Sequence, residues 1–260
     1  MLARCVICGK RAAGRCRYCG DTLCAEHLPP EKHWCVAYYD VSSADEDIDM
    51  RSEIKSGEIS PVISSFNIFS HNFSLLLLIA MSVSFVLQLI YPPYTDLLIL
   101  KPAYLIERPW TLVTHIFLHS GFEHFFFNML FLAFFAPVLE RAVGNKNFLA
   151  VFLISGIAAG AGWCLTTSNP LSGVLGASGA LCGVFGALAV LMPRMKIYLF
   201  FLIPMEMWLA AILFALYDFL FAFAPVSDHI AHTAHLSGLF IGMLAGEILR
   251  RRHHRVMPIY

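Results

Sequence analysis

A serine and a histidine inside apolar stretches are the residues of this sequence best suited to chemistry. Ser178 lies in the run GASG at 176–179, and His235 lies in the run AHLSG at 234–238. A serine hydroxyl is a weak nucleophile until a base removes its proton, and neutral histidine can do this near pH 7. Polar side chains in apolar membrane segments usually mark function, because their burial in hydrocarbon is costly. The pair therefore predicts hydrolysis by a serine nucleophile within a membrane.

The composition fits such a location. Of the 260 residues 58% are hydrophobic and 14% are charged, with a mean hydropathy of +0.68. A soluble domain would carry about a quarter charged residues. The formal net charge is zero, so nucleic acid is not an expected partner. A cysteine-rich, basic N-terminus argues against a cleavable signal peptide. We therefore expect a multi-pass membrane protein whose surroundings are the lipid bilayer.

Six apolar blocks are long enough to be membrane helices. They cover residues 73–91, 122–140, 147–165, 178–193, 198–222 and 232–249. Basic residues follow the second, fourth and sixth blocks, whereas the loops after the third and fifth carry none. Because positive residues mark the cytosolic side, both termini are expected in the cytosol. The loop 92–118 is long, apolar and aromatic, and we expect it to lie in the membrane interface.

Helical rise brings the polar residues of three blocks to one depth. Ser178, His235 and His124 each lie fifteen or sixteen residues before a charged residue near the cytosolic end of their block. At ~1.5 Å per residue these are about 22 to 24 Å, so in a hydrocarbon layer ~30 Å thick all three lie just below the external surface. Glycines at four-residue spacing on the fourth and sixth blocks would let these helices approach closely. Ser178 and His235 are therefore expected within hydrogen-bond reach.

The tetrahedral intermediate of this reaction needs hydrogen-bond donors for its oxyanion. His124 and Asn128, one helical turn deeper, can supply side-chain donors, together with the backbone N–H of Ser178. Gly176 leaves room for the backbone of a substrate. Asp228 lies more than a turn from His235, so no carboxylate is well placed in the sequence and we expect a catalytic dyad. No cofactor is expected for catalysis.

The N-terminal segment, residues 1–36, predicts a separate metal-binding unit. Its cysteines and histidines form four closely spaced pairs: Cys5, Cys8, Cys16, Cys19, Cys24, His27, His33 and Cys35. Zinc prefers four Cys or His ligands in a tetrahedron, so eight ligands suit two structural zinc ions. Such a short segment buries little apolar surface, and the metals would supply its stability. A disulfide cluster is the alternative, which the paired histidines and a cytosolic location disfavour.

The remaining segments complete the domain organisation. Residues 37–70 are rich in Asp, Glu and Ser without helical or strand periodicity, and we expect a flexible acidic linker. The membrane domain is expected over 71–252. A cytosolic tail, 253–260, follows it and carries His and Arg residues suited to anchoring at the membrane surface.

The membrane part of the sequence resembles the rhomboid intramembrane serine proteases over residues 73–250. The shared motifs are Gly-x-Ser-Gly at 176–179, His-x3-Asn at 124–128 and Ala-His-x2-Gly-x3-Gly at 234–242. The resemblance implies an all-α fold, a bundle of six transmembrane helices whose serine opens to water on the external side. It also implies an endopeptidase that cleaves transmembrane protein substrates in or beside their membrane segments. We assign Gly176 and Trp110, in the first loop, to substrate binding.

Two positions depart from the family pattern. Thr111 follows Trp110 where many members have arginine, which bears on how the first loop is anchored. Cys182 stands one turn after Ser178, where a tyrosine often stacks under the catalytic histidine. The support beneath His235 is therefore open.

The N-terminal segment resembles the AN1-type zinc finger family in ligand order and spacing, except that the gap between Cys8 and Cys16 is short. The cross-braced arrangement of that family implies one zinc on Cys5, Cys8, Cys24 and His27, and a second on Cys16, Cys19, His33 and Cys35. Two roles are open for this finger. It could recruit or regulate through a cytosolic, for example ubiquitin-like, protein partner, or it could cap the N-terminus.

Other functions compete with proteolysis. A rhomboid-like protein without activity could bind transmembrane clients, but such proteins typically lose the serine or the histidine. A transporter would be favoured by inverted repeats and paired half-helices, which the sequence does not have. We expect a prokaryotic plasma membrane, an archaeal one included, because no organelle-targeting segment precedes the finger.

Several other histidines have simpler interpretations than catalysis. His115 and His119 are expected to anchor the first loop near the interface, since a metal site formed by them with His124 lacks a carboxylate. His229 and His232 are expected at a solvated helix end. Glu206 is expected at the cytosolic start of a helix.

Overall fold

The computed structural model describes residues 4–5, 10–17, 22–29, 33, 72–199, 202–222 and 230–256. The chain forms two compact units, Met1–His71 and Asn72–Tyr260. In the first unit β1 (Gly14–Arg15) pairs antiparallel with β2 (Thr22–Leu23). Leu23 is fully buried there. The predicted linker, residues 37–70, lies outside the described residues.

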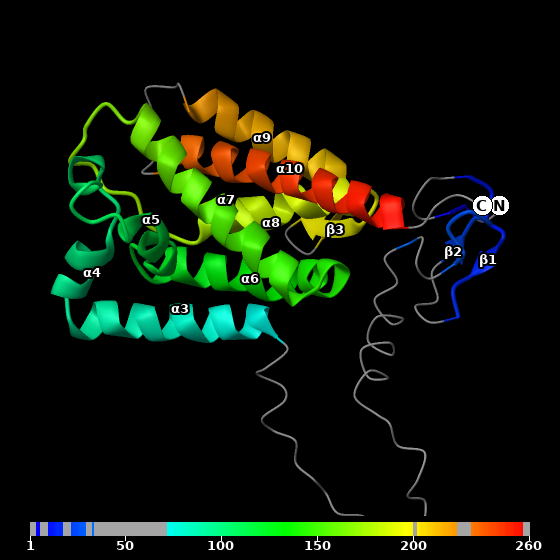
Figure 1. Ribbon diagram of the computed structural model, residues 1–260, viewed down its shortest axis with the longest axis horizontal. Coiled ribbons are helices and arrows are strands. Elements are labelled where there is room, and N and C mark those ends of the chain that lie inside the picture. The colour runs from blue at the N-terminus through cyan, green and yellow to red at the C-terminus, as the bar shows by residue number, and fades with distance from the viewer. Residues whose placement is uncertain are drawn as a thin grey trace, which may run out of the picture. The chain divides into compact units, whose positions relative to one another are not determined.

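The second unit is helical (Figure 1). Its α-helices are α3 (Phe73–Ile90), α4 (Pro93–Leu98), α5 (Thr111–Thr114), α6 (Phe122–Val143), α7 (Asn145–Thr166), α8 (Ser178–Leu191), α9 (Met207–Ala222) and α10 (His232–Val256). By length and composition, α3, α6 and α7 could each cross a membrane, and α8 and α9 are shorter apolar helices. Helix α8 packs against α6, α7, α9 and α10, and nearly all of its residues are buried. The first residue of this central helix is Ser178.

Glycines permit the close contact between α8 and α10. A Cβ added to Gly238 would lie 2.0 Å from the carbonyl oxygen of Gly179, and one added to Gly242 would lie 1.9 Å from that of Gly183. The two backbones therefore touch where the four-residue glycine spacing predicted a close approach. This contact brings the start of α8 beside the first turns of α10.

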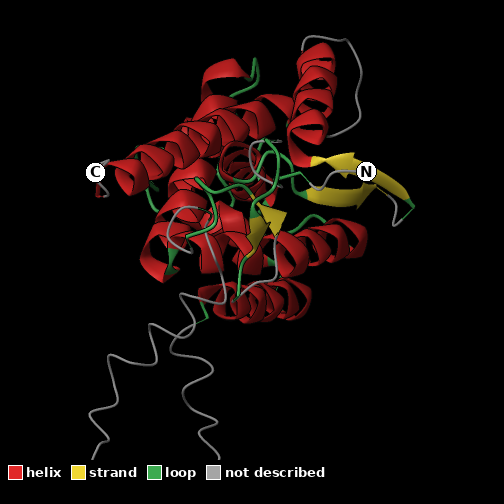
Figure 2. Cartoon of the chain, turned by 90° about the vertical axis from the view of Figure 1, so that its right-hand side faces the viewer, coloured by secondary structure: helices red, strands yellow, loops and turns green. Residues whose placement is uncertain are grey.

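The prediction of one helix over residues 198–222 is wrong. Lys196–Leu199 (β3) and Ile203–Glu206 (β4) pair as an antiparallel hairpin, and α9 begins only at Met207. Pro204 explains the difference, since proline lacks a backbone N–H and clashes with the preceding turn of a helix. The strictly all-α expectation is corrected accordingly, although strands are confined to short hairpins in the described residues (Figure 2). Glu206 precedes α9 as expected.

The long loop before α6 is folded rather than extended. It contains α4, η2 (Pro102–Tyr104), α5 and η3 (His115–Phe117). Thr111 is buried, and its hydroxyl donates to the carbonyl of Arg108 at 2.7 Å. The Arg108 guanidinium donates to the carbonyl of Asp96, and the Trp110 indole to that of Leu97. Threonine at 111 therefore holds the start of α5, while Arg108 and Trp110 tie α5 to α4.

A buried carboxylate on α6 fixes the start of α3. Glu140 Oε1 and Oε2 accept the backbone N–H groups of Phe73 and Ser74, at 2.5 and 2.9 Å. Because these are unpaired donors at a helix N-terminus, Glu140→Ala should lower the free energy of unfolding by about 1.5–3 kcal/mol. Thermal unfolding in detergent measures this, with the exposed Glu123→Ala on the same helix as a control. Equal stability of the two variants would contradict the role of Glu140.

Candidate active site

The geometry around Ser178 begins with the turn that precedes α8. Gly176 has φ +126°, a left-handed conformation that glycine adopts without strain. Its N–H donates to the carbonyl of His115 at 2.9 Å. A Cβ at this position would lie 2.6 Å from the His124 ring. The His124 ring therefore occupies the space that a side chain at position 176 would fill. It lies against the turn that precedes Ser178.

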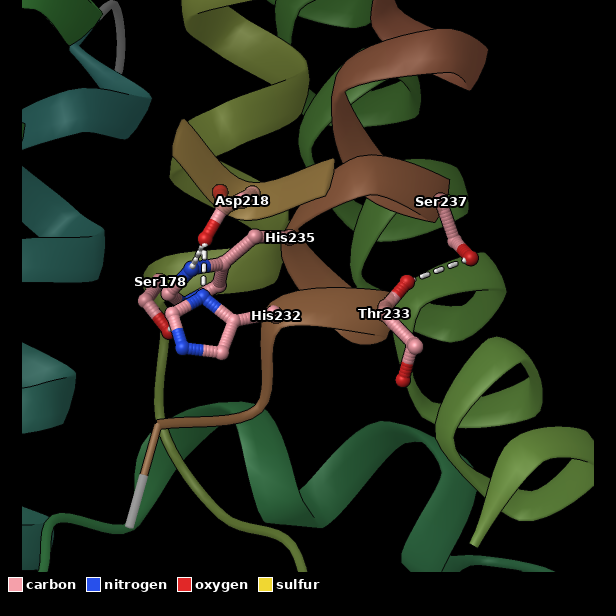
Figure 3. Close-up of polar contacts among 6 residues, drawn as sticks. All are labelled: Ser178, Asp218, His232, Thr233, His235 and Ser237. Carbon is pink, nitrogen blue, oxygen red and sulfur yellow. Dashed lines mark hydrogen bonds and ion pairs between the residues drawn. The ribbon is translucent and has the colours of Figure 1, made fainter. Parts of the chain in front are cut away.

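Ser178 and His235 meet across the contact between α8 and α10. The Oγ of Ser178 lies 2.9 Å from Nε2 of His235, a hydrogen-bond distance (Figure 3). Side-chain exposure of His235 is only 15%. In this arrangement Oγ–H can donate to Nε2, as a histidine acting as general base requires.

His124 and Asn128 lie on α6. Ser120 is within hydrogen-bond distance of His124 Nδ1 through its backbone N–H, at 3.3 Å, and its hydroxyl, at 3.0 Å. With Nδ1 accepting from the backbone, the tautomer of a neutral His124 ring carries its proton on Nε2, which faces Gly176. Asn128 is buried, and its Nδ2 donates to the carbonyl of His124 at 2.6 Å. The amide retains a second N–H, so both side chains can offer a donor.

The expectation that no carboxylate accompanies the serine and histidine is wrong. Asp218, on α9, is 1% exposed, and its Oδ1 lies 3.4 Å from Nδ1 of His235 and 2.5 Å from Nδ1 of His232 (Figure 3). Asp228 is the aspartate close to His235 along the chain, whereas Asp218 is brought to the histidine by the packing of α9 on α10. An aspartate in the middle of an apolar helix was the available signal.

His232 also differs from its prediction. Rather than lying at a solvated helix end, it is 5% exposed and pairs with Asp218. His229 lies outside the described residues. Tyr217 and Phe221 contact the His232 ring, with centroids 5.7 and 5.8 Å away. The carboxylate and this histidine therefore form a polar pair in aromatic surroundings.

An aromatic ring lies beside His235 although Cys182 replaces the tyrosine common in the family. The Phe214 ring, from α9, has its centroid 6.0 Å from that of His235, with an interplanar angle of 32°. Cys182 is buried within α8. Packing support for the histidine therefore comes from a different helix than the sequence comparison suggested.

His115 and His119 behave as loop residues. The His115 ring bonds the carbonyl of Thr111 through Nδ1 at 2.8 Å, and burial lowers its pKa to about 4. The backbone N–H of His119 donates to Gln88 on α3, while burial lowers the pKa of its ring to about 3. Both rings are therefore neutral near pH 7. In the described part of the chain they do not join His124 in a cluster with metal-ligand distances.

Three expected zinc ligands gather in the N-terminal unit. The ligand atoms of Cys5, Cys24 and His27 all lie within 4.8 Å of one another, and both cysteines are buried. Two thiolates and one imidazole are donors that zinc prefers. These are three of the four residues expected at the first zinc. Cys8, Cys19 and Cys35 lie outside the described residues; of the second set, Cys16 and His33 are described and buried.

Comparisons with known proteins agree with the geometry of the helical unit. Residues 107–252 match the model of the Rhomboid domain. The chain is 34% identical over 151 residues to YdcA of Bacillus subtilis, covering 56% of this chain and 70% of that protein. It is 33% identical over 153 residues to RHOMBOID-like protein 5 of Arabidopsis thaliana, covering 58% and 48%. For the rhomboid protease GlpG of Yersinia pestis the identity is 27% over 135 residues, covering 52% and 46%. The chain thus spans about half the length of the last two relatives.

Proposed function

Because this chain belongs to the rhomboid family of intramembrane serine proteases, we propose that it is a multi-pass membrane endopeptidase whose catalytic pair is Ser178 and His235. The observation that carries the proposal is the 2.9 Å separation of Ser178 Oγ and His235 Nε2 at the contact of two apolar helices. A hydroxyl and an imidazole in this arrangement form an activated nucleophile. An inactive relative that only binds transmembrane clients would be expected to lack the serine or the histidine, whereas this chain has both.

The first half-reaction transfers an acyl group to the enzyme. His235 Nε2 takes the Oγ proton as Oγ bonds to the carbonyl carbon of the substrate, whose π electrons move onto oxygen. The backbone N–H of Ser178, Nε2–H of His124 and the second amide N–H of Asn128 are the proposed donors for this oxyanion. When the C–N bond breaks, His235 returns the proton to the leaving amine. Water then attacks the acyl group, with His235 as base, and frees Ser178.

The substrates we propose are proteins with a transmembrane segment, cleaved in or beside that segment. The distribution of basic residues supports cytosolic termini and an active site near the external surface of the membrane, which we propose is a prokaryotic plasma membrane, an archaeal one included. Trp110 is half exposed in the first loop and is positioned for contact with substrate or lipid. Gly176, beside His124, borders the surface on which a substrate backbone would lie.

Cleavage by the purified protein tests this function. The full chain in detergent and in liposomes is incubated with a panel of reporters that carry different transmembrane segments, and products are mapped by mass spectrometry. We expect a cut in or near a transmembrane segment without added nucleotide. Failure to cut any reporter under conditions in which the protein remains folded would contradict the proposal.

For the N-terminal unit, we propose an AN1-like finger that binds two structural zinc ions and recruits or regulates through a cytosolic protein. The convergence of Cys5, Cys24 and His27 supports the first site. Zinc there would hold a segment whose own apolar core is small. Zinc has no part in the proposed hydrolysis, which needs only groups of the helical unit.

Removing a ligand gives a direct prediction for this unit. The purified full chain is expected to contain two zinc ions, and Cys24→Ser should reduce the content to about one, because a site left with three ligands binds zinc weakly. Elemental mass spectrometry measures the metal per chain. Cys164→Ser, on α7, is the matched control and should retain both ions. Unchanged zinc in Cys24→Ser would refute the assignment, and cleavage of a simple reporter should be equal in all three proteins.

A further inference from the structure

We infer that Asp218 and His232 form a buried, proton-sharing pair that orients His235 and fixes its tautomer, so that the catalytic arrangement extends from α10 to α9. This inference rests on the proposed function of Ser178 and His235. It concerns positioning residues, since the side-chain hydrogen bond of Ser178 among the described residues is to His235 and not to Asp218 or His232.

The juxtaposition depends on three side chains from two helices. His232 and His235 are three residues apart on α10, so they lie on one face of that helix. Asp218 extends from α9 toward this face, and its single oxygen Oδ1 approaches Nδ1 of both rings (Figure 3). Ser237 and Thr233, on the same helix, point away from the group (Figure 3). The carboxylate is therefore directed at the two histidines specifically.

Burial explains why the pair must share a proton. Asp218 is 1% and His232 5% exposed, and an ionised carboxylate in such surroundings is costly unless a proton or a cation compensates it. Among the described residues, the ion pairs of Asp218 are with His232 and His235 only, and its Oδ2 has no hydrogen-bond partner. The 2.5 Å contact between His232 Nδ1 and Asp218 Oδ1 is shorter than the ~2.7–2.9 Å typical of a charge-assisted N–H···O bond, so a proton must lie between the two atoms. When His232 carries a proton on each ring nitrogen and the one on Nδ1 is shared with Asp218 Oδ1, the pair has no net charge.

The pair determines which nitrogen of His235 carries the proton. When Ser178 donates to Nε2, the proton of the neutral ring must be on Nδ1. Asp218 Oδ1 is the acceptor toward which this N–H is directed, at 3.4 Å. Without it the opposite tautomer, with the proton on Nε2, would be equally accessible and could not act as a base. Ring orientation and tautomer are thus set from α9.

The contact between Asp218 and His235 also stabilises the charge that forms on His235 during the reaction. As Nε2 takes the proton from Oγ, His235 becomes an imidazolium that keeps its Nδ1 proton, and the carboxylate stabilises the new charge. Asp218 does not take that proton. His232, by holding its own proton on the other side of Oδ1, keeps the carboxylate in place when the pair is resting.

Asp218→Asn tests the inference, because it keeps the shape of the side chain and removes its charge. We expect kcat to fall by about 10- to 100-fold, the loss typical when the hydrogen-bond partner of a metal-binding histidine is removed, with KM and thermal unfolding unchanged. Asp96→Asn, an exposed aspartate on the short helix α4, is the matched control and should match the wild-type protein. His232→Asn retains a donor but cannot share a proton, and should lower kcat in the same way by a smaller factor.

A spectroscopic readout separates positioning from a structural role. Nitrogen NMR of protein with ¹⁵N-labelled histidine should find His235 of the wild-type protein in the Nδ1–H tautomer, and this signal should be lost in Asp218→Asn. Wild-type kcat in folded Asp218→Asn, or an unchanged tautomer, would overturn the inference while leaving the Ser178–His235 proposal intact. If Asp218→Asn does not fold, His232→Asn decides, and wild-type kcat there would overturn it. A wild-type protein that cuts nothing would instead contradict the proposed function, and the NMR result would still decide this inference.

Discussion

Replacing Ser178 by alanine is expected to reduce kcat by about 10⁶-fold, the loss seen when the nucleophile of a serine protease is removed. Only the hydroxyl is lost, and its sole assigned partner among the described residues is His235 Nε2. The variant should therefore fold normally and still bind its substrate. Cleavage of a transmembrane reporter at saturating concentration, followed by mass spectrometry over long incubations, measures the residual rate.

A second serine provides the control for this loss. Ser237 lies on α10 like His235, but its hydroxyl donates to the carbonyl of Thr233 and packs against α7 at Gly162. Ser237→Ala should keep kcat within a few-fold of wild type, which shows that loss of a helix hydroxyl alone is harmless. Residual activity in Ser178→Ala above about one part in 10³ would mean that another nucleophile performs the reaction.

Gly242→Ala is expected to be among the most damaging substitutions for stability. Its Cβ would lie 1.9 Å from the carbonyl oxygen of Gly183, a backbone atom that cannot rotate away. Helices α8 and α10 would have to separate, and overpacking of this severity should cost about 3 kcal/mol or more. Because the same contact holds Ser178 beside His235, cleavage should fall with stability. Thermal unfolding in detergent and the reporter assay measure the two effects.

Gly121→Ala is the matched control for this substitution. A Cβ at Gly121 meets nothing within 4 Å, and the residue has an extended backbone that alanine adopts easily. Its unfolding temperature should stay close to that of the wild-type protein. A stable and fully active Gly242→Ala protein would show that the two helices are not packed through this glycine.

The sequence was most informative where residues repeat at helical spacing. Glycines at 238 and 242 predicted a backbone contact between two blocks, and counting residues from the charged ends placed Ser178 and His235 at one depth. Both inferences depend only on helical rise and on residue size. In the structure the two backbones touch at these glycines, the side chains of Ser178 and His235 meet, and α3, α6 and α7 are long and apolar enough to cross a membrane.

Two kinds of feature could not be predicted from helical spacing: the places where a helix is interrupted, and the contacts that depend on how a helix is rotated. An apolar composition over 198–222 does not distinguish a helix from a hairpin, and Pro204 was the overlooked signal for β3 and β4. Asp218 and Phe214 approach His235 from α9, seventeen and twenty-one residues away along the chain. Only the packing of α9 on α10 shows that these two side chains face His235, because sequence spacing does not say how one helix is rotated against its neighbour.

The measurement that most directly tests the central claim is covalent labelling of the nucleophile. A fluorophosphonate reacts with a serine that a neighbouring base activates, and it forms a stable adduct on the oxygen. We predict one adduct per wild-type chain, mapped to Ser178 by mass spectrometry, and a labelling rate that falls by orders of magnitude in His235→Ala. An adduct on a different residue, or equal labelling rates with and without His235, would contradict the account.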